Sequence, residues 1–436
     1  MKQKRLVYCI NNYLCNIKLS IMEKKMISTV VLALIAIISY GQKISGTWNG
    51  KLNAGSQKLS LVFKFMQDGS GKDVCTMDCL EQGVKDFPAV VNYISADSVN
   101  ISITRLGASY VGGLRNGEII GKFSQSGMVF DMNMTTGEVK FIRTQNPMPP
   151  FPYKTEEVTF TNPSDKALFS GTLTYPVGYE KMNKKTVPVV LMITGSGQEN
   201  RDEEVFQHKP FLVIADYLAR NGVATLRYDD RGVGSSKGDV KELTTIVNME
   251  DAMAGLTYLK QLNKFGKIGA LGHSEGGTIT FMLASRGKVD FIISMAGTGV
   301  KGDSVISEQV HRMSELNGLS RDIVEAQIAQ FTKTTNPWLV YFLNFDPASD
   351  IKNTKCPTMA INGTKDMQVI YTSNLFSIKR LLPENRKNLV KEYDGLNHLF
   401  QHCTTGNSSE YVNITETISP EVLKDIADWI KQINLK

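Results

Sequence analysis

The stretch Ile268-Gly-Ala-Leu-Gly-His-Ser-Glu-Gly-Gly277 decides the fold of this 436-residue chain. It begins with a short apolar run, which is typical of a buried strand, and it leads into a helical pattern that ends at Ser285. Between the two lies a G-x-S-x-G motif, in which small residues let the backbone bend sharply and expose a serine hydroxyl. The stretch therefore predicts a strand, a tight turn and a helix, with Ser274 as a candidate nucleophile.

The segments around this turn alternate between strand and helix patterns. Strands are expected at residues 187–194, 223–228, 291–296, 357–362 and 388–393, and helices at residues 211–221, 245–263 and 420–433. This alternation predicts a mostly parallel sheet with helices on both faces. From Ser304 to about Thr334 the pattern is helical with no intervening strand, which predicts a helical cap at about residues 300–350.

A serine nucleophile in such a fold needs an acid and then a histidine later in the chain. Asp366 and His398 each follow a predicted strand, so a loop carboxylate could reach an imidazole there. His398 would take the proton of Ser274, and Asp366 would hold the tautomer of the imidazole and stabilise the imidazolium. Asp394 is the competing acid and His402 is the competing base.

A tetrahedral intermediate would also need two donors for its oxyanion. The backbone N–H of Glu275, the residue after the nucleophile, is the first candidate. The second is expected in the Gly/Ser-rich loop after the strand that ends at Thr194, and we assign it to the backbone N–H of Ser196, with Gly197 as its neighbour.

Over roughly residues 155–436 the chain resembles serine hydrolases of the α/β-hydrolase superfamily. Within that superfamily it is similar to secreted bacterial carboxylesterases of the serine aminopeptidase/acylglycerol lipase-like group. The motifs that carry this resemblance are Gly195-Ser-Gly-Gln-Glu-Asn-Arg-Asp202, Tyr228-Asp-Asp-Arg-Gly-Val-Gly-Ser-Ser236, Gly272-His-Ser-Glu-Gly-Gly277, Asn362-Gly-Thr-Lys-Asp-Met-Gln-Val369 and Gly395-Leu-Asn-His398. The resemblance implies an α/β-hydrolase fold and acyl-enzyme chemistry. It also implies that Asp230 and Arg231 form a structural ion pair beside the oxyanion strand.

The region before residue 146 has a different character. From Ile44 to about Arg143 it shows period-2 and β-branched patterns broken by turn residues, including an expected strand at residues 137–142, and it predicts a small all-β domain at residues 42–145. Proteins of the group named above also carry such a domain near a Gly-x-Trp-x-Gly, here Gly46 to Gly50. The Pro-dense residues 146–154 predict a linker, and residues 155–436 the catalytic domain.

Residues 1–41 predict a secretory signal peptide. They hold six basic residues against one acid, then the apolar run Val30 to Ile38, which is too short to span a bilayer, and an S-x-G exit before Gln42. The true start is expected at either Met1 or Met22. The protein is therefore expected to be exported, periplasmic or extracellular, without a stable membrane anchor.

Most of the formal net charge of +6 belongs to this leader. Without residues 1–41 the 49 basic and 43 acidic residues become 43 and 42, a net charge of +1. Nucleic acid is therefore not expected as a partner. Four cysteines remain, and Cys75 with Cys79 is the local candidate for a disulfide, with zinc as a weaker alternative. We expect no cofactor and no metal.

The sequence favours an esterase over other functions. Its expected substrate is a small-molecule carboxylic ester with a short to medium acyl or aryl group, because aromatic residues gather in the predicted cap, namely Phe331, Trp338, Tyr341, Phe342 and Phe345. An aminopeptidase-type or other amide or thioester hydrolase remains the alternative, since acids lie near the oxyanion loop, namely Glu199, Asp202, Glu203 and Glu204. A non-catalytic ligand-binding protein, and a contact between the β-domain and a glycan or polymer, also stay open.

Overall fold

The structure, a computed structural model, describes residues 43–54, 57–82, 84–318 and 320–434. The chain divides into two compact units, Met1–Lys140 and Phe141–Lys436. The predicted signal peptide lies outside the described residues.

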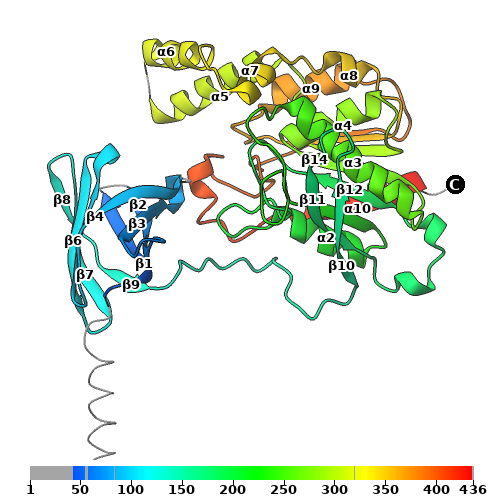
Figure 1. The fold of residues 1–436 in the computed structure, drawn as a ribbon. Coiled ribbons are helices and arrows are strands. Elements are labelled where there is room, and N and C mark those ends of the chain that lie inside the picture. Colours follow the sequence, from blue (N-terminus) through cyan, green and yellow to red (C-terminus); the bar gives the residue numbers. More distant parts are fainter. Residues whose placement is uncertain (1–42, 55–56, 83, 319, 435–436) are drawn as a thin grey trace, which may run out of the picture. The chain divides into compact units, whose positions relative to one another are not determined.

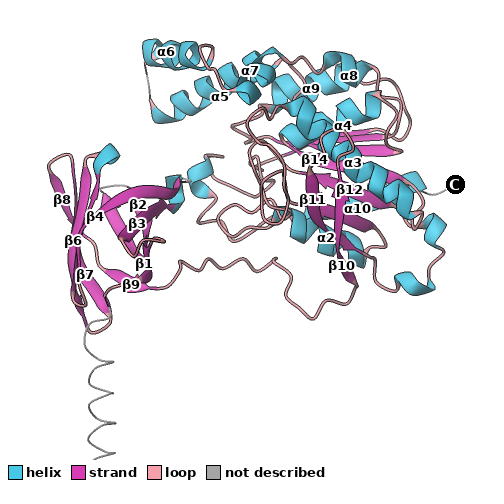
Figure 2. Ribbon diagram, viewed as in Figure 1, coloured by secondary structure: helices cyan, strands magenta, loops and turns pink. Residues whose placement is uncertain are grey.

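The first unit is built from antiparallel strands (Figure 2). They run in the spatial order β6-β5-β4-β3-β2-β1-β9-β7-β8, and a further pairing of β6 with β7 closes the sheet. Their bounds are β1 Gly46–Ala54, β2 Gln57–Gln67, β3 Asp73–Cys79, β4 Val84–Ile94, β5 Ser98–Ile103, β6 Ala108–Arg115, β7 Glu118–Gln125, β8 Met128–Asp131 and β9 Met134–Thr136. The core inside includes Trp48, Phe63 and Tyr110, and the all-β prediction is confirmed.

The cysteines of β3 are not paired with each other. Cys75 and Cys79 both point into the core, and no disulfide joins them. A strand rises about 3.3 Å per residue, so two residues four apart are separated by about 13 Å, which exceeds the reach of a disulfide. The proposed Cys75–Cys79 disulfide is therefore wrong, and the described residues contain no other disulfide.

The chain leaves this sheet earlier than the sequence predicts. Strand β9 ends at Thr136, and residues 137–142 form no strand. The Phe141 N–H donates to the side chain of Gln207, and the Arg143 guanidinium donates to the backbone oxygens of Val412 and Ile414. These bonds fix residues 141–143 to the second unit, so the boundary falls after Lys140 rather than after residue 145.

The second unit contains a mixed sheet, of which Figure 1 labels β10, β11, β12 and β14. Its strands run in the order β10-β11-β13-β12-β14-β15-β16-β17. The pairs β10–β11 and β11–β13 are antiparallel, and all later pairs are parallel. The bounds are β10 Thr155–Thr161, β11 Leu168–Thr174, β12 Val189–Ile193, β13 Ala224–Tyr228, β14 Ile268–His273, β15 Phe291–Met295, β16 Thr358–Gly363 and β17 Leu389–Tyr393. Strands β12 to β16 are buried along their whole length because both of their faces are covered, and β12 is a continuous apolar run.

Helices cover the sheet on both sides. Alternate residues of β12 belong to different cores. Leu191 is part of the core that includes residues of α3 (Thr245–Leu262), α4 (Glu275–Ser285) and α9 (Tyr371–Leu381), and Met192 is part of the core that includes residues of α2 (Pro210–Arg220) and α10 (Pro420–Asn434). This is the period of two expected for a central strand. The prediction of an α/β-hydrolase fold is confirmed.

Four helices lie between β15 and β16, in the segment where the cap was predicted. They are α5 (Gly302–Asn317), α6 (Arg321–Phe331), α7 (Pro337–Asn344) and α8 (Ala348–Lys352). Within the residues that the structure describes, no helix has both the length and the apolar character needed to cross a membrane.

Candidate active site

The candidate site lies where the order of the parallel strands reverses. Strand β12 pairs with β13 on one side and with β14 on the other, so the crossovers that leave β12 and β13 run in opposite directions. Ligands of open α/β sheets bind at such a point, outside the carboxyl ends of the strands. The loop Thr194–Gln198 follows β12, and Ser274 follows β14.

Ser274 occupies a tight turn between β14 and α4. Its φ of 54° is in the left-handed region, which costs energy for a residue with a side chain. The turn depends on close backbone contact, because a Cβ on Gly276 would lie 2.1 Å from the oxygen of Ile193. The N–H of Glu275, the first residue of α4, has no acceptor within the helix and points out of its N-terminus.

Asp366 and His398 form a buried pair. Nδ1 of His398 lies 2.7 Å from Oδ2 of Asp366, and both side chains are almost fully buried. The other oxygen of Asp366 accepts the N–H groups of Gln368 and Val369. Because Nδ1 faces the carboxylate, Nε2 of His398 is the nitrogen left for a substrate or a nucleophile.

The loops that carry Ser274 and His398 are in direct contact. His273, the residue before Ser274, has its Nε2 2.8 Å from the backbone oxygen of His398. The rings of His273 and His398 have centroids 4.6 Å apart. In the part of the chain that the structure describes, no hydrogen bond joins the Ser274 hydroxyl to His398.

The two competing residues lie in other surroundings. Asp394 accepts a hydrogen bond from the Thr364 hydroxyl at an exposed position. The ring of His402 is exposed and is paired with Glu416. Neither residue has a contact with His398 or Ser274 among the interactions of the described residues.

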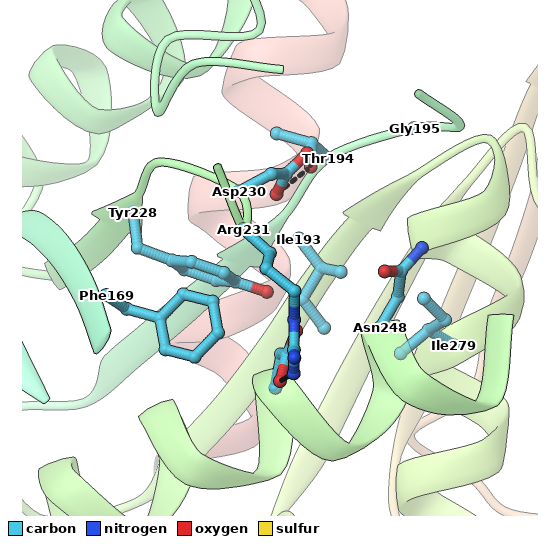
Figure 3. A pocket seen from close by; sticks show the side chains of 10 residues that line it. Phe169, Ile193, Thr194, Gly195, Tyr228, Asp230, Arg231, Asn248 and Ile279 are labelled. Atoms are coloured by element: carbon cyan, nitrogen blue, oxygen red, sulfur yellow. Dashed lines mark hydrogen bonds and ion pairs between the residues drawn. The ribbon is translucent and has the colours of Figure 1, made fainter. Parts of the chain in front are cut away.

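Asp230 stabilises the loop after β12 through hydrogen bonds to both of its ends. The carboxylate of Asp230 accepts the Thr194 hydroxyl at 2.9 Å and the Glu199 N–H at 2.9 Å, and Figure 3 shows the Thr194 contact at the edge of a small cavity. The N–H of Gly195 is occupied by Glu203, which leaves the N–H groups of Ser196 and Gly197 as the nearest candidates for the second oxyanion donor.

The implied ion pair between Asp230 and Arg231 is wrong. The buried Arg231 guanidinium instead binds Asp251, at 2.6 and 3.0 Å, and Asp165. Neighbouring side chains at a strand end point in different directions, so Asp230 turns toward Thr194 while Arg231 turns toward helix α3 (Figure 3). Both residues brace the turn, but through separate partners.

Three carboxyl groups near the site are partly or fully buried, namely Glu199, Asp230 and Glu275. Burial and the nearby charges of Glu203 and Asp230 raise the pKa of Glu199 to about 9. Burial raises the pKa of Asp230 to about 7, although its hydrogen bonds act in the opposite direction. Burial also raises the pKa of Glu275. The described residues hold no cluster of His, Cys, Asp and Glu that could bind a metal ion.

The aromatic residues of the cap are not equivalent. The Trp338 indole reaches the site, where it donates to Glu275, and it stacks on Phe342 with ring centroids 5.4 Å apart. Tyr341 stacks on Phe345. Phe331, at the end of α6, is 39% exposed and has no such contact among the described residues.

This order of strands, with a serine in the turn between β14 and α4, is that of the α/β-hydrolase fold, and the chain is similar to serine hydrolases of that superfamily. Over residues 209–339 the chain matches the family model described as serine aminopeptidase, S33. The match covers helix α2, the turn with Ser274 and most of the cap.

Curated relatives are similar to parts of the chain. The esterase EstD of Thermotoga maritima is 29% identical over 277 residues, which cover 60% of this chain and 65% of that protein. An acyl transferase of Photobacterium leiognathi is 28% identical over 116 residues, which cover 26% of this chain and 35% of that protein. The chain therefore matches less than two thirds of the length of either relative.

Among solved structures, Est1E of Butyrivibrio proteoclasticus with bound ferulic acid covers 63% of this chain and 97% of its own, at 19% identity and a TM-score of 0.42. An esterase of Pyrococcus furiosus covers 64% of this chain and 93% of its own, at 16% identity and a TM-score of 0.41.

Proposed function

We propose that the protein is a carboxylesterase that cleaves its substrate through a seryl acyl-enzyme. The observation that carries the proposal is the buried Asp366–His398 pair, whose loop is bonded through His273 to the turn of Ser274. The similarity to the esterase EstD supports the same reaction class.

In the proposed mechanism the Ser274 hydroxyl attacks the ester carbonyl, and Nε2 of His398 takes its proton. Asp366 keeps the remaining proton on Nδ1 and stabilises the imidazolium. The N–H groups of Glu275 and Ser196 bind the oxyanion. The alcohol leaves with the proton from His398, and a water molecule, activated by the same histidine, then hydrolyses the acyl-enzyme.

The test is a panel of p-nitrophenyl acetate, butyrate and aryl esters beside aminoacyl anilides. The wild-type protein should turn over esters, and Ser274→Ala should abolish turnover and labelling by a fluorophosphonate. Ser320→Ala, at an exposed position before α6 that makes no cap bond, is the matched control. Inactivity of the wild type on all esters would refute the proposal, and faster cleavage of anilides would favour the amidase.

The proposal includes export of the enzyme. It is supported by the basic residues and the apolar run of residues 1–41, which have the pattern of a signal peptide. When the full chain is expressed in a bacterial host, N-terminal sequencing of the periplasmic protein should give Gln42 as the first residue. An uncleaved cytoplasmic chain would contradict export and would leave the esterase proposal intact.

A further inference from the structure

Glu203 is a buried acid between the loop after β12 and helix α2. It is 5% exposed and has a φ of 52°, in the left-handed region that residues with side chains rarely adopt. The proposed mechanism gives it no role. A buried carboxylate in a strained position normally has a specific partner.

A single oxygen of Glu203 makes two contacts. Oε1 accepts the N–H of Gly195 at 3.0 Å and lies 2.9 Å from Nδ1 of His273. Gly195 belongs to the loop of the oxyanion donors, and His273 precedes Ser274. A Cβ on Gly195 would lie 3.5 Å from both Glu203 Oε1 and the Cβ of Ser274, so the three residues are close neighbours.

His273 extends this chain of contacts to a third loop. Its Nε2 lies 2.8 Å from the backbone oxygen of His398, and a carbonyl oxygen can only accept, so Nε2 carries a hydrogen. Nδ1 faces an oxygen that already accepts from Gly195. Burial by itself would lower the pKa of His273, but the charge and hydrogen bond of Glu203 raise it to about 9. The ring is therefore an imidazolium at neutral pH that donates from both nitrogens.

We infer that Glu203 is a positioning residue, which holds the oxyanion loop, the turn of Ser274 and the loop of His398 in register through its bonds to Gly195 and His273. This inference rests on the proposed function. Because one oxygen serves both donors, the negative charge matters as well as the shape of the side chain.

A glutamine at position 203 has the same shape as glutamate but is neutral. Beside a neutral His273 ring, it cannot keep all three hydrogen bonds, namely those from Gly195 N–H and from His273 Nδ1 to residue 203, and that from His273 Nε2 to the His398 oxygen. If its oxygen occupies the Oε1 position, Nδ1 must carry the hydrogen, and a neutral His273 then loses the bond from Nε2 to His398. If its NH₂ group occupies that position, two donors face each other, and the N–H of Gly195 loses its acceptor. Glu203→Gln should therefore release one of the three loops without removing bulk.

The experiment compares Glu203→Gln, His273→Asn and the double variant with Glu204→Gln as the control. Glu204 is the next residue in the chain, and its side chain reaches only Lys209 among the described residues, at 3.5 Å. Each single variant should lower kcat for p-nitrophenyl butyrate by about 10- to 100-fold with KM changed less than about twofold, since a small misplacement of reacting groups acts mainly on the chemical step. The double variant should be no slower than the slower single one. Glu204→Gln should match the wild type.

Thermal unfolding in the same buffer separates positioning from loss of fold. A folded Glu203→Gln or His273→Asn with wild-type kcat would overturn the inference, as would additive losses in the double variant. If Glu203→Gln does not fold, His273→Asn still decides, because the same loss of kcat is expected from it. Ser274→Ala distinguishes the two proposals: activity in that variant would refute the proposed function, whereas its inactivity beside a fully active Glu203→Gln would refute only the role of Glu203.

Discussion

The indole Nε1 of Trp338 lies 2.9 and 3.0 Å from the two carboxylate oxygens of Glu275, the residue that follows Ser274. Trp338 belongs to the cap helix α7, and Glu275 begins helix α4. Glu275 is only 2% exposed, and burial raises its pKa while its hydrogen bonds lower it. A hydrogen bond therefore links the cap directly to the turn that carries the candidate nucleophile.

Trp338→Phe tests this link. Phenylalanine can keep the stacking on Phe342 but lacks the N–H, so Glu275 would lose a donor in a buried position. An unsatisfied buried group costs about 1–3 kcal/mol. We expect a lower melting temperature and a higher KM for p-nitrophenyl butyrate, because α7 is no longer hydrogen-bonded to the residue that follows Ser274. Tyr341→Phe on the same helix removes a hydroxyl and keeps the stack on Phe345, and it should behave like the wild type. Equal effects of the two variants would contradict the link.

The assignment of the acid and the base can be tested with matched pairs. Asp366→Asn should lower kcat by about 1,000- to 10,000-fold, because an amide no longer holds the imidazole in the required tautomer. His398→Gln should remove the base altogether. Asp394→Asn and His402→Gln alter the nearby exposed residues and should leave kcat within about twofold, as surface changes usually do. Full activity of Asp366→Asn beside an inactive Asp394→Asn would reverse the assignment.

Much of the fold could be predicted because it depends on local patterns. The largely apolar strands β12 and β15, the helices that follow them in the chain and the turn of Ser274 are all visible in short stretches of sequence. The positions of Asp366 and His398 after successive strands could be predicted for the same reason, since the carboxyl ends of parallel strands share one edge of the sheet.

The contacts that brace the site could not be predicted, because their partners are distant in the sequence. Arg231 binds Asp251 and Asp165 rather than the adjacent Asp230, and no local pattern identifies those partners. The sequence shows Glu203 only as one of several acids near the oxyanion loop. The one available signal was His273 inside the G-x-S-x-G motif, where an ionisable ring beside the nucleophile needs a partner.

The charge of Asp230 predicts a pH-dependent stability. Its pKa rises from 3.8 to about 7 in the folded protein, with burial as the main cause, so the folded state holds this proton more tightly than the unfolded state. Between those two values the folded protein binds more protons, and stability therefore falls as the pH rises. Asp230→Asn cannot ionise and should escape this loss.

The measurement is the difference in melting temperature between Asp230→Asn and the wild type from pH 5 to pH 8. The difference should become more positive as the pH rises and level off above about pH 7, where the wild-type carboxyl is ionised. Ser235→Ala, at an exposed position of the neighbouring turn, changes no ionisable group and should give a difference that does not depend on pH. A constant difference for Asp230→Asn would show that its charge does not oppose folding.

The close approach of α4 to β12 gives the last prediction. A Cβ on Gly276 would lie 2.1 Å from the oxygen of Ile193 and 2.5 Å from that of Thr194, and backbone oxygens cannot turn away as a side chain can. Gly276→Ala must therefore push helix α4 away from the end of β12. That movement separates the N–H of Glu275 from the loop of Ser196, the two proposed oxyanion donors.

Activity should consequently fall further than stability does. Overpacking of this kind costs about 1–3 kcal/mol in stability, whereas loss of one oxyanion donor lowers kcat by about 100- to 1,000-fold. Gly69→Ala is the control, because a Cβ there meets no atom within 4 Å, and it should change neither quantity. Melting temperature and kcat are measured on the same preparations. A Gly276→Ala protein that loses stability but keeps its kcat would mean that the spacing between α4 and the end of β12 matters only for the fold. The second oxyanion donor would then have to lie outside the loop after β12.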